Sequence, residues 1–272
     1  MNKIIVSCGK HLFVMIEYST SLIAGRSIIR ENKGNILPTF AYSVLDNYIT
    51  GEIVIDECSA LIGTSAGIYV VVGNEKNDKF LDLLMVKFKS RKIANQRFTL
   101  FSSSLNWDNR IKKLFGAELK QLQRYSFKFN EDNFSKLSKT NLPDNFQLNM
   151  TNEESIHGNR NFYIEYIIKY WGTVENFMTK GFGFSVTQNN VHAGECVSIF
   201  SSLGFAEIDI VTNDHFRGRG LAQCTSEAFI LECLNRKLTP KWDCDIHNLA
   251  SINLARKLSF ANPEKYSVFV RK

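Results

Sequence analysis

The segment from Val211 to Ala222 contains the residues of this sequence best suited to bind an anion. It reads Val-Thr-Asn-Asp-His-Phe-Arg-Gly-Arg-Gly-Leu-Ala and joins an alternating run, expected to be a strand, to an apolar run expected to be a helix. Glycines let a backbone approach a ligand closely, and the first N–H groups of a helix lie unpaired at the positive end of its dipole. A pyrophosphate fits such a turn, with Arg217 and Arg219 adding charge. Taken alone, a Gly-x-Gly turn is equally a plain strand-to-helix connection.

Carboxylates lie just before this turn and have the chemistry of a general base. Glu207 and Asp209 alternate with isoleucines, so they share one face of the expected strand, unless a bulge shifts the phase. Glu195 lies on the preceding expected strand. A carboxylate can take the proton that an ammonium must lose before its nitrogen attacks a carbonyl. Solvated charge on a half-exposed strand is an equal alternative for Glu207 and Asp209.

Two motifs in order resemble the GNAT superfamily of N-acetyltransferases. Arg217, Gly220 and Ala222 match its Gln/Arg-x-x-Gly-x-Gly/Ala signature, and Asn248 to Phe260 is similar to its Asn-x-x-Ser/Ala helix. The resemblance implies direct acetyl transfer from acetyl-CoA to a primary amine in a ternary complex, without a metal. The cofactor-binding residues that it implies are Ile210, Val211, Thr212, Arg217, Gly218, Arg219, Gly220, Leu221, Ala222, Asn248 and Ser251.

The resemblance also implies catalytic roles. Glu207 is the first choice of general base, Asp209 the second, and Glu195 a third. Backbone N–H groups near Ile210 to Thr212 are candidate donors to the oxyanion. Ser251 is the hydroxyl residue of the second motif and joins the catalytic candidates.

A finer resemblance, to the zwittermicin-resistance-like branch of the superfamily, covers more of the chain. It rests on 207–212, 217–222, 229–234 and 240–244, and on 51–56 in the first half. It implies an acceptor amine on a small molecule, antibiotic-like in kind, or on a peptide.

Two departures from the superfamily pattern bear on catalysis. Ala255 stands where many members have a tyrosine that protonates the leaving thiolate, and Ser259 replaces the usual glycine before Phe260. The missing tyrosine favours an alternative function, a non-catalytic module that binds acyl-CoA as a sensor. Asn248 likewise has an alternative role, as the cap of the helix that begins beside it.

The expected fold is α+β with a mixed sheet, comprising an N-terminal α+β domain over 1–139 and a GNAT acyl-CoA N-acyltransferase domain over 140–272. A polar stretch, 130–149, is the expected connection. Strands are expected at 51–57, 68–73, 125–129, 181–187, 192–200, 206–212, 241–244 and 266–270, and helices at 79–88, 107–122, 160–171, 221–235 and 249–258. No sequence repeat is evident.

The composition narrows the functional classes. The 272 residues carry a net charge of +6 without a Lys/Arg-dense run, so we expect no nucleic-acid partner. Ile4 to Ile16 is too short and interrupted to span a bilayer, so we expect no membrane partner. Six cysteines occur without a C-x-x-C pair, which indicates no zinc site and a reducing cytoplasm. A small-molecule amine is the expected partner, and a homodimer stays open.

Overall fold

The computed structural model describes residues 3–7, 13–14, 18–32, 36–158 and 161–272. These residues form two compact units. Unit 1 comprises Met1–Arg124 with Lys265–Lys272, and unit 2 comprises Tyr125–Glu264. Each unit is described by itself below.

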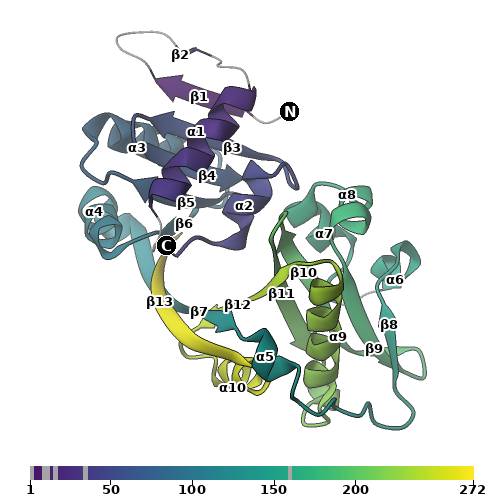
Figure 1. Ribbon diagram of the computed structural model, residues 1–272. Coiled ribbons are helices and arrows are strands. Elements are labelled where there is room, and N and C mark those ends of the chain that lie inside the picture. Colours follow the sequence, from purple (N-terminus) through teal and green to yellow (C-terminus); the bar gives the residue numbers. More distant parts are fainter. Residues whose placement is uncertain (1–2, 8–12, 15–17, 33–35, 159–160) are drawn as a thin grey trace. The chain divides into compact units, whose positions relative to one another are not determined.

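Unit 1 is a sheet with helices, and the chain leaves it along β7 and re-enters it along β13 (Figure 1). Its elements are β1 (Lys3–Ser7), β2 (Phe13–Val14), α1 (Tyr18–Glu31), α2 (Thr39–Leu45), β3 (Gly51–Asp56), β4 (Ser59–Thr64), β5 (Ile68–Gly73), α3 (Asp78–Ile93), β6 (Thr99–Ser102), α4 (Leu105–Phe115), the 3₁₀ turn η1 (Gly116–Glu118), β7 (Leu119–Phe129) and the end of β13 (Phe260–Arg271).

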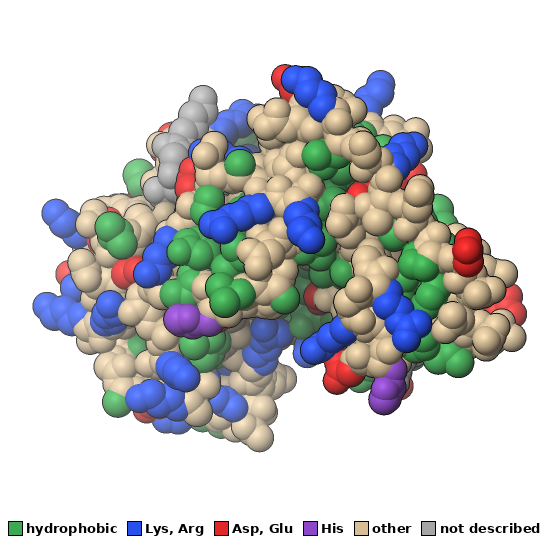
Figure 2. All heavy atoms as spheres, turned by 90° about the horizontal axis from the view of Figure 1, so that it is seen from below, with side chains coloured by type: hydrophobic (Ala, Val, Ile, Leu, Met, Phe, Trp, Pro, Cys, Tyr) green, Lys and Arg blue, Asp and Glu red, His purple; other side chains and the backbone are tan. Residues whose placement is uncertain are grey.

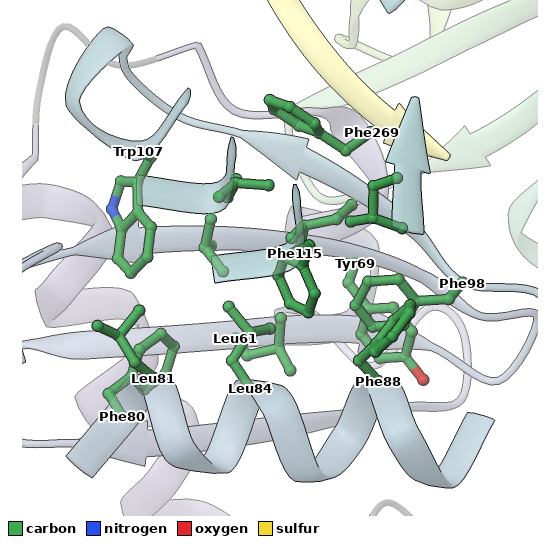
Figure 3. Close-up of a cluster of buried hydrophobic side chains, with 14 of the residues drawn as sticks. Leu61, Tyr69, Phe80, Leu81, Leu84, Phe88, Phe98, Trp107, Phe115 and Phe269 are labelled. Carbon is green, nitrogen blue, oxygen red and sulfur yellow. The ribbon is translucent and has the colours of Figure 1, made fainter. Parts of the chain in front are cut away.

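The sheet of unit 1 has the strand order β2-β1-β3-β4-β5-β6-β13. The pairs β1–β3 and β5–β6 are parallel, while β3–β4, β4–β5 and β6–β13 are antiparallel. One face packs on α3, whose Phe80, Leu84 and Phe88 point toward the strands (Figure 3). Trp107 of α4 meets Phe80 edge to face at 5.8 Å. Aromatic burial of this kind stabilises the unit.

Unit 2 contains the carboxylates and the glycine turn. Its elements are the end of β7, α5 (Glu131–Phe134), β8 (Gln147–Met150), α6 (Glu153–Gly158), α7 (Ile164–Trp171), α8 (Val174–Lys180), β9 (Gly183–Gln188), β10 (Val191–Ser201), β11 (Phe205–Thr212), the 3₁₀ turn η2 (Asp214–Phe216), α9 (Leu221–Asn235), β12 (Thr239–Asp245), α10 (Leu249–Lys257) and the start of β13.

The sheet of unit 2 has the order β13-β7-β12-β11-β10-β9-β8. The pairs β8–β9, β9–β10 and β10–β11 are antiparallel, and the pair β11–β12 is parallel. Phe127 of β7 is buried in one cluster with Trp242 and Phe260. A strand from before residue 139 therefore lies in the sheet and core of unit 2. The boundary between the compact units falls at Arg124 and Tyr125, and the expectation of separate domains at 1–139 and 140–272 stays a prediction.

The two units repeat one order of elements. In each, helices precede a three-stranded antiparallel meander, which is followed by a helix, a strand parallel to the last meander strand, another helix and a final strand. The meander is β3-β4-β5 in unit 1 and β9-β10-β11 in unit 2. The repeat is one of architecture, without a repeat of sequence that we detect.

The mixed α+β fold with a mixed sheet is confirmed. Three expected helices are wrong in extent. The helix over 107–122 ends at Phe115, because Gly116 adopts φ +52° and caps it, and β7 begins at Leu119. The helix over 79–88 continues to Ile93, and the helix over 160–171 begins only at Ile164, its first expected residue lying outside the described residues. The polar connection is held on α9 at Glu227, whose carboxylate accepts hydrogen bonds from Thr140 N at 2.9 Å and Thr140 Oγ1 at 2.5 Å.

No helix among the described residues is long and apolar enough to cross a membrane. Within the same residues, no group of three or more His, Cys, Asp or Glu is arranged to hold a metal ion. On the face drawn in Figure 2, Lys and Arg side chains are dispersed among polar and apolar surface.

Candidate active site

The turn before α9 places the start of that helix at the carboxyl end of β11. Gly218 and Gly220 both adopt φ +78°, a conformation that disfavours any residue with a Cβ. Space is open around them: a Cβ at Gly218 would meet nothing within 4 Å, and one at Gly220 only Thr140 Cγ2 at 3.9 Å. The glycines are therefore required by backbone conformation, and a ligand has room to approach.

The head of α9 is left without a side-chain cap. The first helical hydrogen bond runs from Cys224 N to Gly220 O at 3.1 Å, so the N–H groups of Leu221, Ala222 and Gln223 precede the helical ladder. These amides lie at the positive end of a 15-residue helix. The geometry is that of an anion site.

The two arginines of the turn are exposed and held by neighbours within it. Arg217 Nη2 lies 2.7 Å from Asp214 Oδ1, and the Arg219 guanidinium lies 5.5 Å from the centroid of the Phe216 ring. Phe216 in turn packs edge to face on Phe146. The turn thus places positive charge beside the start of α9.

The strands β11 and β12 separate at this end of the sheet. Their parallel pairing covers Phe205–Thr239, Ala206–Pro240 and Glu207–Lys241. Both strands are described along their whole length. Beyond these three pairs, β11 at 208–212 and β12 at 242–245 are not hydrogen-bonded to each other as strand partners. The edge of β11 at 210–212, which sequence analysis assigned to cofactor binding, therefore faces an opening in the sheet.

The three candidate carboxylates share one face. In the β10–β11 register Asp209 is opposite Val197, Glu195 is opposite Val211, and Glu207 is opposite Phe200. Residues directly opposite in an antiparallel pair project to the same side. The bulge lies in β10, between Ser198 and Phe200, so the alternation along β11 is unbroken.

Asp209 is paired with a tyrosine that sequence analysis missed. Tyr166 Oη of α7 donates a hydrogen bond of 2.6 Å to Asp209 Oδ2. Burial, followed by the charge of Asp209, raises the pKa of Tyr166 well above its ordinary value. The phenol therefore remains a donor across the neutral range. The only sequence signal is the aromatic row Phe162, Tyr166 and Tyr170 at helical spacing, which reads equally as core.

Glu195 is used differently. It is 1% exposed, and its Oε2 accepts the backbone N–H groups of Asn161 and Phe162, each at 3.2 Å. His192 Nδ1 lies 3.4 Å from the other carboxylate oxygen, an ion pair when the imidazole is protonated. These bonds hold the residues that lead into α7, so the structure gives Glu195 an anchoring contact.

Glu207 lies where the sheet is still closed. It is half-buried, and its register partner in β12 is Lys241. Asp209, two residues farther along, is the first carboxylate of this face beyond the β11–β12 pairing. Glu207 and Asp209, the two candidate general bases on this face, thus differ in their position relative to the opening between β11 and β12.

The second motif forms the start of α10. Asn248 is its N-cap and accepts the N–H of Ser251 through Oδ1 at 3.1 Å, while Ser251 Oγ accepts from Trp242 Nε1 at 3.0 Å. The capping alternative for Asn248 is thus present, and cofactor contact by these two residues stays a prediction. Ala255 is fully buried in the core of unit 2.

The chain matches the model of the GNAT acetyltransferase family over residues 33–269. It is 38% identical over 236 residues to the uncharacterized N-acetyltransferase YdfB of Bacillus subtilis (strain 168), covering 85% of this chain and 90% of that protein.

Solved structures share the fold. A GCN5-related N-acetyltransferase-like protein from Streptococcus suis 89/1591 aligns with a TM-score of 0.71 at 23% identity, covering 93% of this chain and 100% of that one. A tandem GNAT protein from the clavulanic acid biosynthesis pathway aligns with a TM-score of 0.62 at 10% identity, covering 93% and 95%.

Proposed function

Because the chain belongs to the GNAT acetyltransferase family, we propose that it transfers an acetyl group from acetyl-CoA to a primary amine of a small molecule or peptide. The observation that carries this proposal is the uncapped head of α9, placed by Gly218 and Gly220 where β11 and β12 separate.

The residues present fit acetyl-CoA. The N–H groups of Leu221, Ala222 and Gln223 would bind the pyrophosphate, with Arg217 and Arg219 adding charge. The open edge of β11 at 210–212 would hydrogen-bond the pantetheine arm. Bound acetyl-CoA supplies an activated thioester carbonyl.

Asp209 is the general base in this proposal. It lies beyond the β11–β12 pairing, whereas Glu207 lies inside it and Glu195 is engaged with backbone amides. Asp209 takes the proton of the acceptor ammonium, directly or through water, which frees the nitrogen lone pair for attack. Glu207, on the same face, adds negative charge that attracts a cationic amine.

Backbone N–H groups of the β11 edge near Ile210 would stabilise negative charge on the carbonyl oxygen. Ala255 offers no proton to the leaving thiolate, so the thiolate of CoA departs unassisted, as its low basicity permits. The proposed acceptor is a primary amine on a small, antibiotic-like molecule or on a peptide, as the resemblance to the zwittermicin-resistance-like branch implies.

Calorimetric titration with acetyl-CoA tests the binding half of this proposal. Gly220→Glu adds a strained Cβ and a negative charge at the anion site, so we expect acetyl-CoA binding to be lost. Gly116→Glu is the matched control, because Gly116 also has positive φ and open surroundings but lies in unit 1. Equal binding by wild type and Gly220→Glu would overturn the assigned site.

Thiol release from acetyl-CoA with a panel of primary amines tests the catalytic half. Release that depends on amine and falls on Asp209→Asn supports the transferase. The buried Ala255 favours the second candidate, a non-catalytic acyl-CoA sensor. That candidate predicts tight binding without thiol release by any amine.

A further inference from the structure

We propose that Tyr166 is a positioning residue for the general base, holding the Asp209 carboxylate in one orientation and in its charged form. The proposal rests on the acetyl transfer described above. Its basis is the 2.6 Å hydrogen bond from Tyr166 Oη to Asp209 Oδ2, which joins α7 to β11.

The helix that carries Tyr166 is fixed to the sheet at both ends. Before its start, Asn161 and Phe162 donate their backbone N–H groups to Glu195 of β10. At its end, Trp171 Nε1 donates to Ser198 O of β10 at 3.0 Å. The phenol is therefore presented to Asp209 from an anchored helix, and this explains why Glu195 is buried without serving as the base.

Ring contacts further restrict the phenol. The Tyr166 ring lies 4.9 Å from the ring of Phe162 and 4.8 Å from that of Tyr170, centroid to centroid. Tyr170 packs edge to face on Phe200 of β10 at 5.7 Å. A ring packed between two others loses little further freedom when its hydroxyl holds a carboxylate.

The charged groups around Asp209 bear on whether its carboxylate stays ionised, and so on the effect of the Tyr166 hydrogen bond. Glu207 lies on the same strand and face, and Glu195 and His192 lie on β10. Lys241 of β12 is the register partner of Glu207, and Lys169 of α7 lies over the ring of Tyr170. Nearby carboxylates favour a protonated Asp209, while a hydrogen bond donated to the carboxylate favours the charged form that a base requires.

Carboxyl-carbon NMR titration of the ligand-free protein tests the pair without any acceptor. In Tyr166→Phe the carboxylate of Asp209 loses the hydrogen bond from Tyr166 Oη, so we expect its titration midpoint to rise. The matched control is Tyr163→Phe, which removes a hydroxyl from an exposed tyrosine just before α7. A midpoint equal to that of wild type in Tyr166→Phe would overturn the proposal.

Kinetics with acetyl-CoA and the best amine of the panel give the second readout. We expect kcat in Tyr166→Phe to fall about 10-fold or more, because a misplaced catalytic group is costly. The acid limb of the kcat/KM profile should move to higher pH, with acetyl-CoA affinity unchanged. A lower kcat with an unmoved acid limb would contradict control of the base. If no amine is acetylated, the proposed function fails, while the NMR titration still decides the pair.

Discussion

Gly220 and Asn77 occupy the same place in the repeated order of elements, each directly before the helix that follows a meander, yet they leave those helices in opposite states. Gly220 adds no cap to α9, whereas Asn77 Oδ1 accepts the N–H of Phe80 at 3.1 Å and caps α3. Asp78 adds a negative charge to the first turn of α3. The parallel pairing of β5 with β6 covers all four residues of β6, so the opening seen beside β11 has no counterpart there.

These differences predict one acetyl-CoA per chain, bound by unit 2. Calorimetry on wild type should give a stoichiometry of one, and Gly220→Glu should abolish all of it. Asn77→Ala should lower the free energy of unfolding by about 1 kcal/mol through the lost cap, without changing acetyl-CoA affinity. Binding of a second acetyl-CoA per chain, or binding that survives in Gly220→Glu, would contradict a single site in unit 2.

The ion pair between Asp214 and Arg217 should tune cofactor affinity. Arg217→Ala removes a charge beside the amides, and because the site is exposed we expect a loss of about 1 kcal/mol, roughly fivefold in Kd, that shrinks with added salt. Asp214→Asn should tighten binding, since it removes the carboxylate that pairs with Arg217. Lys113→Ala in unit 1 controls for net charge. Equal affinity in all three variants would show that Arg217 does not reach the ligand.

Cysteine reactivity should follow burial. Cys58 is exposed, whereas Cys196 is fully buried, and burial raises its pKa to about 12. At pH 8 iodoacetamide should therefore label Cys58 and spare Cys196, as read by peptide mass spectrometry. Labelling of native Cys196 as fast as Cys58 would contradict this placement.

The same shift has a consequence for stability. The unfolded chain releases the Cys196 proton near pH 9, while the folded chain retains it to higher pH. The contribution of this thiol to the free energy of unfolding is therefore present in full below about pH 9 and is lost as the pH rises toward 12. Denaturant unfolding should show wild type losing stability over this range more steeply than Cys196→Ala. Parallel slopes for the two proteins would contradict the shift.

Ser259 occupies a backbone conformation that favours glycine. It follows α10 with φ +66°, at the position where the superfamily pattern has glycine. Ser259→Gly should therefore raise the free energy of unfolding by about 1 kcal/mol, whereas Lys257→Gly, within α10, should lower it by a similar amount. Denaturant melts compare the two. Destabilisation by Ser259→Gly would show that its hydroxyl contributes more than the backbone strain costs.

Local patterns determined much of unit 2. The Arg-Gly-Arg-Gly turn, the alternation in β11 and the helical period of α9 and α10 depend on near neighbours, so the glycine turn and the shared face of Glu207 and Asp209 could be predicted. The end of α4 at Gly116 was equally local, but the apolar spacing over 107–122 continues into β7 and hid it.

Other features depend on long-range pairing, for which one sequence carries no signal. Tyr166 meets Asp209 across 43 residues of chain, and Glu195 binds amides 33 and 34 residues away. Phe127 joins the core of Trp242 although a polar stretch intervenes. The sequence therefore determined the anion-binding turn and the set of carboxylates, because both follow from local backbone geometry. Only the tertiary structure distinguished the carboxylates, since burial, register and hydrogen-bond partners are properties of the folded chain.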